Sequence, residues 1–174
     1  IDFYDIIIPS PSVPLNHKIY SYSKYIIGEI ELAYQKYNNV NWIGITGTNG
    51  KTTLTSILEK FFQNIVGNIG IPCSILPEYI KLNSPIVAEL SSFQLSSIDQ
   101  FKPKIAVILN ITHDHIDYHG SFENYKLAKL HITRNQTDKD IIILPPEEWA
   151  ISLKTKAKKI YFGTNTFDNC IYSE

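Results

Sequence analysis

The segment that most constrains the fold is a glycine-rich turn between an apolar run and an amphipathic stretch. It spans residues 44–53 and reads Gly-Ile-Thr-Gly-Thr-Asn-Gly-Lys-Thr-Thr. Residues 40–46 suit a buried strand, and residues from about 52 to 63 suit a helix. Glycines allow backbone N–H groups to point inward at an anion, and the start of a helix adds partial positive charge. This order of strand, turn and helix therefore predicts a phosphate-binding loop.

Side chains of the loop have separate expected roles. Lys51 reaches the outer phosphates of a nucleotide, and Thr52 offers its hydroxyl to a Mg²⁺ ion. Ile45 stands where the strict pattern has a glycine, five residues before Gly50, so the loop is a variant. The residues expected to hold the cofactor are Gly47, Thr48, Asn49, Gly50, Lys51, Thr52 and Thr53.

Apolar strands alternate with helical stretches through the rest of the chain. The pattern predicts strands near 85–90 and at 104–110, 141–144 and 159–162, and helical stretches at about 92–100 and at 122–135. Such alternation predicts an α/β fold with a mostly parallel sheet covered on both faces. One junction is unusual, because helix 52–63 reaches residues 66–70 with almost no room for the usual next strand. Either the connection is trimmed or residues are absent between Asn64 and Ile65.

Two segments precede the regular pattern. Residues 3–8 form a short apolar run that ends at Pro9, which predicts a buried strand entering a loop. We expect this strand to be the last piece of a domain whose beginning is missing. Residues 19–38 are rich in tyrosine, carry a partial helical pattern and are expected to be a connector.

Composition excludes several function classes. The formal net charge is −1 and Arg134 is the only arginine, so a nucleic-acid-binding surface is not expected. Cys73 and Cys170 lack metal-ligand or disulfide-framework spacing, which suits a reducing compartment. No apolar stretch reaches the roughly 18 residues of a membrane span. We expect a cytoplasmic protein, and the absence of methionine predicts a fragment or a processed chain.

A second motif places an acid at the end of an apolar strand. Glu89 follows Ile-Val-Ala and precedes Leu-Ser-Ser-Phe-Gln-Leu. Ligands of open α/β sheets bind at the carboxyl ends of the strands, where a lone carboxylate can hold Mg²⁺ against phosphates. The alternative is a solvated glutamate at a strand end.

A third cluster follows the strand that ends at Asn110. Residues 112–119 contain three histidines and two aspartates, at positions 113, 115, 119, 114 and 117. This density suits metal or phosphate contacts at the same edge of the sheet. Taken singly, each histidine is more typical of a structural role.

Lys129 interrupts the apolar stripe of the helix predicted at 122–135, where Phe122, Tyr125 and Ile132 share its side. In one account the stem is buried and the ammonium reaches water. In the other, burial lowers the pKa, and the neutral amine reacts with carbon dioxide to give a carbamate able to bind Mg²⁺. The sequence leaves both accounts open.

Four sequence motifs, in this order along the chain, resemble the central domain of the Mur ligase family. They are Thr-Gly-Thr-Asn-Gly-Lys-Thr-Thr at 46–53, Glu-Leu-Ser-Ser-Phe-Gln-Leu at 89–95, Asn-Ile-Thr-His-Asp-His-Ile-Asp at 110–117 and Tyr-Lys-Leu-Ala-Lys-Leu-His-Ile at 125–132. The match covers residues 40–174. The second motif, together with residues 66–72 and 9–14, is similar to the corresponding sequences of the family members that add D-glutamate.

The resemblance implies roles for particular residues. The catalytic residues are Lys51, His115 and Lys129. Lys51 and Thr52 contact the ATP phosphates and the metal. Glu89 binds the first Mg²⁺, and His115 and carbamylated Lys129 bind the second. The substrate contacts are Ser10, Asn68, Ser91, Gln94 and His115. Ser12 departs from the family, which usually has glycine there, and this weakens the expected diphosphate contact.

The resemblance also implies an activity. ATP activates the carboxylate of UDP-N-acetylmuramoyl-L-alanine as an acyl phosphate, and the amine of D-glutamate attacks it, in peptidoglycan biosynthesis. Residues 1–39 correspond to the end of the N-terminal substrate-binding domain with its Rossmann-like fold and to the connector. Residues 40–174 correspond to the central ATP-binding domain. The C-terminal amino-acid-binding domain is absent, so we expect this monomeric fragment to be inactive alone.

Two other functions fit the same residues. One is another Mur or folylpolyglutamate-type ligase that acts on a different amino acid or on folate. The other is a phosphate-loop module that binds nucleotide without ligation. His115 and a buried Lys129 argue against the latter, because an ordinary phosphate-loop protein does not need a second metal site.

Overall fold

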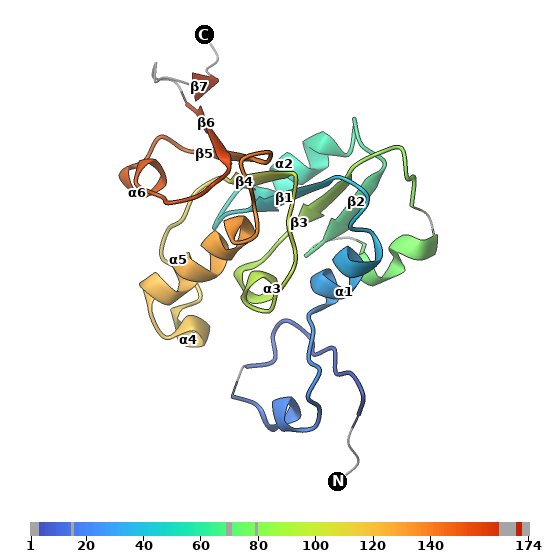
Figure 1. Ribbon diagram of the computed structural model, residues 1–174. Coiled ribbons are helices and arrows are strands. Elements are labelled where there is room, and N and C mark those ends of the chain that lie inside the picture. Colours follow the sequence, from blue (N-terminus) through green and yellow to red (C-terminus); the bar gives the residue numbers. More distant parts are fainter. Residues whose placement is uncertain (1–3, 15, 69–70, 79, 164–169, 172–174) are drawn as a thin grey trace.

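The centre of the molecule is a parallel sheet. The computed structural model describes residues 4–14, 16–68, 71–78, 80–163 and 170–171. Within these residues seven strands pair side by side in the order β2-β3-β1-β4-β5-β6-β7 (Figure 1). Every neighbouring pair is parallel. The strands are β1 (Trp42–Thr46), β2 (Asn64–Gly67), β3 (Ile86–Glu89), β4 (Ile105–Ile108), β5 (Ile141–Leu144), β6 (Lys158–Phe162) and β7 (Cys170–Ile171).

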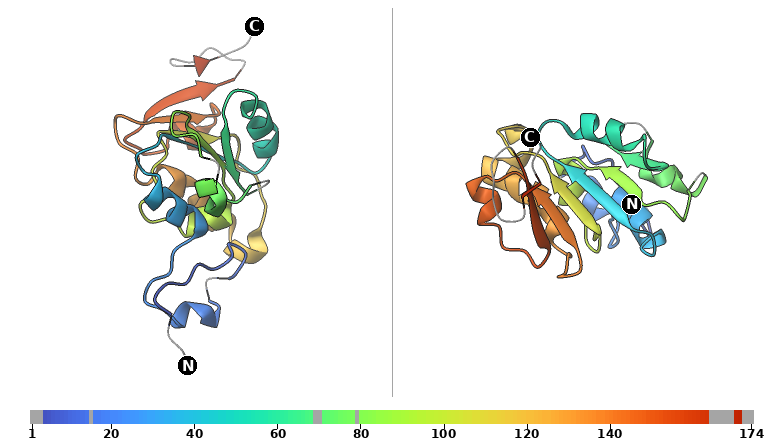
Figure 2. Two further views of the ribbon diagram at one scale, coloured as in Figure 1. Left: turned by 90° about the vertical axis from the view of Figure 1, so that its right-hand side faces the viewer. Right: turned by 90° about the horizontal axis from the view of Figure 1, so that it is seen from above.

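Helices cover both faces of the sheet (Figure 2). On one face, α2 (Lys51–Leu58) packs Leu54 and Leu58 against the apolar side chains of the central strands. The other face carries a larger apolar core, to which α1 (Glu29–Lys36), α3 (Ser92–Ser96), α5 (Phe122–Leu130) and α6 (Glu148–Ile151) contribute. The remaining short helices are α4 (Ile116–His119), η1 (Lys18–Ser21), η2 (Cys73–Glu78) and η3 (His131–Thr133). No helix in the described residues is long and apolar enough to cross a membrane.

The predicted α/β class with a parallel sheet is confirmed. The five strands predicted between residues 40 and 162 are present within two residues at each end. The helices are shorter than predicted, because apolar periodicity continues into turns. After α2, for example, the N–H of Phe61 donates to the carbonyl of Leu58 at 2.9 Å, which closes a tighter turn.

After α2, where almost no room for a strand was expected, the structure has a short strand. The chain runs on through Asn64 and Ile65 as β2, which pairs with β3 from Asn64 opposite Ile86 to Gly67 opposite Glu89. The buried Asn64 side chain donates to the carbonyls of Lys81 and Ser84 at 2.8 and 2.9 Å. A four-residue strand therefore suffices, because this side chain fixes its first residue to the loop before β3.

Helix α1 is attached to the sheet by a buried carboxylate and an aromatic cluster. Glu31 is fully buried and accepts the backbone N–H groups of residues 99–101 at 2.9 to 3.0 Å. The rings of Tyr34, Trp42 and Phe101 pack edge to face, with centroids 5.4 to 5.9 Å apart. The stretch predicted as a connector is thus packed onto the sheet through α1.

The N-terminal segment does not form the buried strand predicted at 3–8, of which residue 3 lies outside the described residues. Ile7 is buried and makes a single parallel bridge with Ile26. Its neighbours Ile6 and Ile8 are 52% and 46% exposed. The prediction failed because the described residues around this run offer one bridge partner and no second layer to cover it.

Candidate functional site

The glycine-rich loop joins the carboxyl end of β1 to the first residue of α2, as predicted. Gly50 has φ of +83° and stands immediately before the helix. A left-handed conformation of this kind favours glycine. A Cβ on Gly47 would lie 3.1 Å from the Leu109 Cβ, so the loop also passes close to the chain that follows β4. The loop therefore ends in a left-handed glycine immediately before the start of α2, where the partial positive charge of a helix lies.

Lys51 folds back over its own loop. Its Nζ donates to the carbonyls of Gly47 and Thr48 at 2.8 and 3.0 Å. Burial lowers its pKa, whereas the negative charges of Glu89 and Asp114 act in the opposite direction. An ammonium group thus lies over the loop, where it can exchange carbonyl partners for phosphate oxygens.

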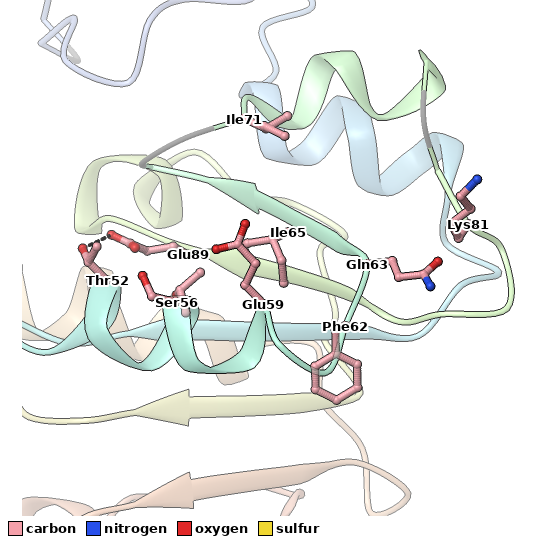
Figure 3. Close-up of a pocket in the computed structure, with 10 residues that line it drawn as sticks. Thr52, Ser56, Glu59, Phe62, Gln63, Ile65, Ile71, Lys81 and Glu89 are labelled. Carbon is pink, nitrogen blue, oxygen red and sulfur yellow. Dashed lines mark hydrogen bonds between the residues drawn. The ribbon is translucent and has the colours of Figure 1, made fainter.

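Glu89 ends β3 beside the loop, and its side chain is 1% exposed. The Thr52 hydroxyl and the Asn68 side-chain amide both donate to its Oε1 at 3.4 Å. Figure 3 shows Glu89 and Thr52 facing each other across the end of a hollow that runs along α2. The alternative of a solvated strand-end glutamate is wrong, since this carboxylate is buried and paired with polar groups of the predicted site.

His115 adopts a left-handed conformation, with φ of +48°, and stands immediately before α4. Such a conformation is uncommon for a residue other than glycine and recurs at functional sites. Its Nε2 lies 3.4 Å from Asp114 Oδ2, and its ring packs against Phe93 with centroids 4.9 Å apart.

The other two histidines of the cluster make packing contacts. His119 Nε2 lies 3.0 Å from the hydroxyl of the buried Ser92, and His113 stacks on Phe122 at 4.2 Å. Burial and the positive charges of His115 and Lys129 lower the pKa of His119. His113 and His115 are both exposed, and His115 is the one whose ring lies next to Asp114.

Lys129 lies on α5 with its side chain turned under the loop. It is 2% exposed, its Nζ donates to the Gly47 carbonyl at 2.9 Å, and the same atom lies 4.8 Å from the centroid of the Tyr125 ring. Burial, aided by the positive charge of Lys51, lowers the pKa of Lys129 from 10.5 to about 7. The snorkelling account is wrong, because this ammonium does not reach water.

Ser91 and Gln94 form a capping box at the start of α3. Ser91 Oγ accepts the Gln94 N–H at 3.2 Å, and Gln94 Oε1 accepts the Ser91 N–H at 2.9 Å. These side chains already have a helix-capping role. Ser10 lies in the exposed N-terminal segment, where its Oγ is 3.2 Å from the Ser12 hydroxyl. The contact of the predicted substrate residues with a substrate stays a prediction.

The structure adds two residues that the sequence did not single out. Asn110 contacts the backbone of the loop, and Tyr125 contacts the Thr48 hydroxyl. Asp114, which belongs to the predicted cluster, acts to raise the pKa of both lysines. Asn110 appears in the sequence as the last residue of an apolar strand, and Tyr125 as part of an apolar stripe. Apolar periodicity indicates on which face of a helix or strand a residue lies, but it does not identify the hydrogen-bond partner of a polar side chain.

The oxygen donors of the site fit Mg²⁺. Thr52 and Glu89 provide one hydroxyl and one carboxylate, and Mg²⁺ usually binds one or two carboxylates together with water and phosphates. Among the described residues, no group of three or more histidine, cysteine, aspartate or glutamate side chains is placed to hold a metal alone. The residues present therefore suit an ion that arrives with a phosphorylated ligand.

Comparison with known proteins supports one family. Residues 45–173 match the family described as Mur ligase middle domain. The UDP-N-acetylmuramoylalanine--D-glutamate ligase of Clostridioides difficile is 44% identical over 188 aligned positions, which cover 100% of this chain and 42% of that protein. The ligase of the same name from Natranaerobius thermophilus is 36% identical and covers 94% of this chain and 40% of its own length. The chain thus spans about two-fifths of these relatives.

Solved structures show the same fold. The MurF ligase of Thermotoga maritima in complex with ADP superposes with a TM-score of 0.59 at 18% identity, over 93% of this chain and 51% of that one. The UDP-N-acetylmuramate:L-alanyl-gamma-D-glutamyl-meso-diaminopimelate ligase of Neisseria meningitides superposes with a TM-score of 0.56 at 15% identity, over 92% and 59%. At these identities the likeness concerns the fold alone.

Proposed function

The chain belongs to the Mur ligase family, and from that premise we propose that it forms the nucleotide-binding part of an ATP-dependent ligase that adds D-glutamate to UDP-N-acetylmuramoyl-L-alanine. The observation that carries the proposal is the arrangement of Lys51, Thr52 and Glu89 around a phosphate-type loop. The names of its relatives support the choice of substrates, and the ADP complex of the Thermotoga maritima protein supports the choice of nucleotide.

The chain's own residues position and neutralise the phosphates. Lys51 turns from the carbonyls of its loop to the outer phosphates, while the start of α2 faces the inner ones. Thr52 and Glu89 would hold Mg²⁺, which would neutralise charge on the phosphates. Asn68 donates to the same Glu89 oxygen as Thr52 and so orients the carboxylate.

The proposed reaction has two steps. A carboxylate oxygen of the muramoyl substrate attacks the γ-phosphorus of ATP, ADP leaves, and an acyl phosphate forms. The amine of D-glutamate then attacks the acyl carbon, the C–N bond forms, phosphate leaves with the bonding electrons of the C–O bond, and the nitrogen loses a proton to solvent. Catalysis of this kind rests on positioning and charge neutralisation, which is the task of Lys51.

We extend the proposal to Lys129 and His115. A lysine whose pKa lies at about 7 is substantially neutral at neutral pH. Its Nζ can then attack carbon dioxide and lose a proton, which gives a carbamate with a carboxylate-like charge. His115 and Lys129 both lie near the Tyr125 ring, with a ring centroid distance of 6.1 Å for His115 and 4.8 Å from Lys129 Nζ, and together they would supply donors for a second Mg²⁺.

The test is nucleotide binding by the 174-residue chain. Titration calorimetry with MgADP should detect binding by the chain, and Lys51→Ala should weaken it at least tenfold while circular dichroism stays unchanged. Lys60→Ala, at an exposed lysine just beyond α2, should bind as tightly as the parent chain. Near-normal binding by the folded Lys51→Ala variant would contradict the proposal. In the longer protein, the same substitution should abolish ligation.

A further inference from the structure

The loop between β1 and α2 is held from outside at three successive residues. Each contact comes from a segment after β4 or from α5, far along the sequence. The pairs are Gly47 with Lys129, Thr48 with Thr112 and Tyr125, and Asn49 with Asn110. A glycine-rich loop has many accessible conformations, so contacts of this kind restrict it before a ligand arrives.

Asn110 makes the most complete of these contacts. Its Oδ1 accepts the Asn49 N–H at 2.9 Å, and its Nδ2 donates to the Asn49 carbonyl at 3.1 Å. Its own backbone carbonyl accepts the Thr48 N–H at 3.0 Å. The side-chain amide thus pairs with both main-chain groups of Asn49, as a neighbouring strand would. An amide has the required donor and acceptor together, which a carboxylate or an aliphatic side chain lacks.

The hydroxyl of Thr48 is also fully used within the protein. It accepts the Thr112 N–H at 3.0 Å, lies 3.2 Å from the Thr112 carbonyl, to which it can donate, and lies 2.9 Å from the Tyr125 hydroxyl, where either oxygen can be the donor. One donor and two acceptor positions complete the capacity of a hydroxyl. Neither this group nor the Asn49 N–H is left for a phosphate, so these two residues shape the loop.

We infer that Asn110 is a positioning residue that presets the loop for phosphate binding by clamping the peptide groups of Asn49. The inference rests on the proposed function, because it assigns the loop a phosphate ligand. Both side-chain bonds of Asn110 lie at the solvent-exposed surface. Water can replace them when they are lost, so the loss affects ligand binding more than folding.

The test compares Asn110→Ala with Asn135→Ala in the 174-residue chain. Asn135 is a matched control, because its Nδ2 also holds backbone, through the carbonyls of Asp99 and Phe101 at 2.7 and 3.0 Å. These bonds join the segment after η3 to the loop before β4. Asn110→Ala should weaken MgADP binding about tenfold, with a small change in melting temperature. Asn135→Ala should lower the melting temperature and leave the affinity unchanged.

Amide hydrogen exchange without nucleotide provides a second readout. The Asn49 N–H should exchange faster in Asn110→Ala than in the parent chain, and at the parent rate in Asn135→Ala. If the parent chain fails to bind MgADP, the proposed function fails, and the exchange of Asn49 alone decides the role of Asn110. Unchanged Asn49 exchange, or a MgADP affinity within twofold of the parent, would overturn the inference. An equal loss of affinity in both variants would overturn it too, since it would indicate a general effect of lost stability.

Discussion

The carbonyl oxygen of Gly47 accepts hydrogen bonds from two ammonium groups. Lys51 reaches it from the same loop at 2.8 Å and Lys129 from α5 at 2.9 Å. Two like charges around one oxygen disfavour each other, and the charge of Lys51 is one cause of the lowered pKa of Lys129. A phosphate that draws Lys51 away would leave Lys129 as the remaining side-chain partner of this carbonyl.

Replacing Lys129 by methionine should stabilise the chain at low and neutral pH. The folded-state pKa of about 7 lies below the ordinary 10.5, so the unfolded chain binds more protons between these values. The stability of the parent should therefore rise with pH from about 7 towards 10.5, by at most on the order of 5 kcal/mol. Lys129→Met should be more stable than the parent near pH 6, and the difference in unfolding free energy between the two proteins should decrease as the pH rises.

Urea unfolding of Lys129→Met and the parent at pH 6, 8 and 9.5 measures this difference in unfolding free energy. Lys60→Met, at an exposed lysine, serves as the control for adding an apolar side chain. A stability difference that stays constant over this range would show that the charge of Lys129 is not its source.

Individual residues were predictable where their chemistry is tied to a local pattern. Lys51 and Glu89 were located because a glycine-rich turn and the end of an apolar strand mark their positions. Asn110 and Tyr125 were missed, because each owes its role to a partner more than 60 positions away. The buried state of Lys129 was open in the sequence, since a helical pattern fixes its side and not its depth.

At the scale of elements, one carboxylate contributes to the attachment of α1 beside the aromatic cluster. Glu31→Gln should lower the free energy of unfolding by about 2 to 3 kcal/mol, because an amide presents one acceptor and an N–H₂ group to the three backbone N–H donors of residues 99–101. Chemical denaturation provides the measurement. Glu59→Gln, at an exposed position, should change stability little. A loss of less than 0.5 kcal/mol in Glu31→Gln would contradict this account.

A second prediction at this scale concerns Gly67, the last residue of the edge strand β2. Gly67 has φ of +124°, and a Cβ there would collide with the backbone of Glu89. Gly67→Ala should therefore separate β2 from β3, displace Glu89 and weaken MgADP binding together with stability. Gly120→Ala provides a control, since Gly120 also has positive φ but nothing lies within 4 Å of an added Cβ. Equal melting temperatures for the two variants would count against the close approach.

The elements themselves were predictable to different degrees. Strands of the sheet centre followed from apolar runs, because both of their faces are buried. β2 did not, because its short Asn64–Gly67 segment depends on Asn64 bonds to a distant loop. The helix ends were also missed, since turns such as 58–61 continue the apolar pattern while changing the hydrogen bonding.

For the whole molecule, we predict that the 174-residue chain alone does not ligate D-glutamate. The chain spans about two-fifths of its relatives, and the proposed reaction needs three reactants held together. Such positioning contributes on the order of 7 to 11 kcal/mol. Incubation with ATP, Mg²⁺, the UDP-muramoyl substrate and D-glutamate should give no product, whereas MgADP still binds. Robust product formation by the purified chain would disprove this.

The strand order has a consequence for how such a protein can diverge. The residues proposed to act on phosphate and metal follow β1, β3 and β4, which are neighbours at the centre of the sheet. Strands β5, β6 and β7 extend one side without contributing any of them. A substitution at an exposed position of β6 is therefore separated from the proposed chemistry, whereas one in β5 still alters the core through the buried Ile142 and Leu144.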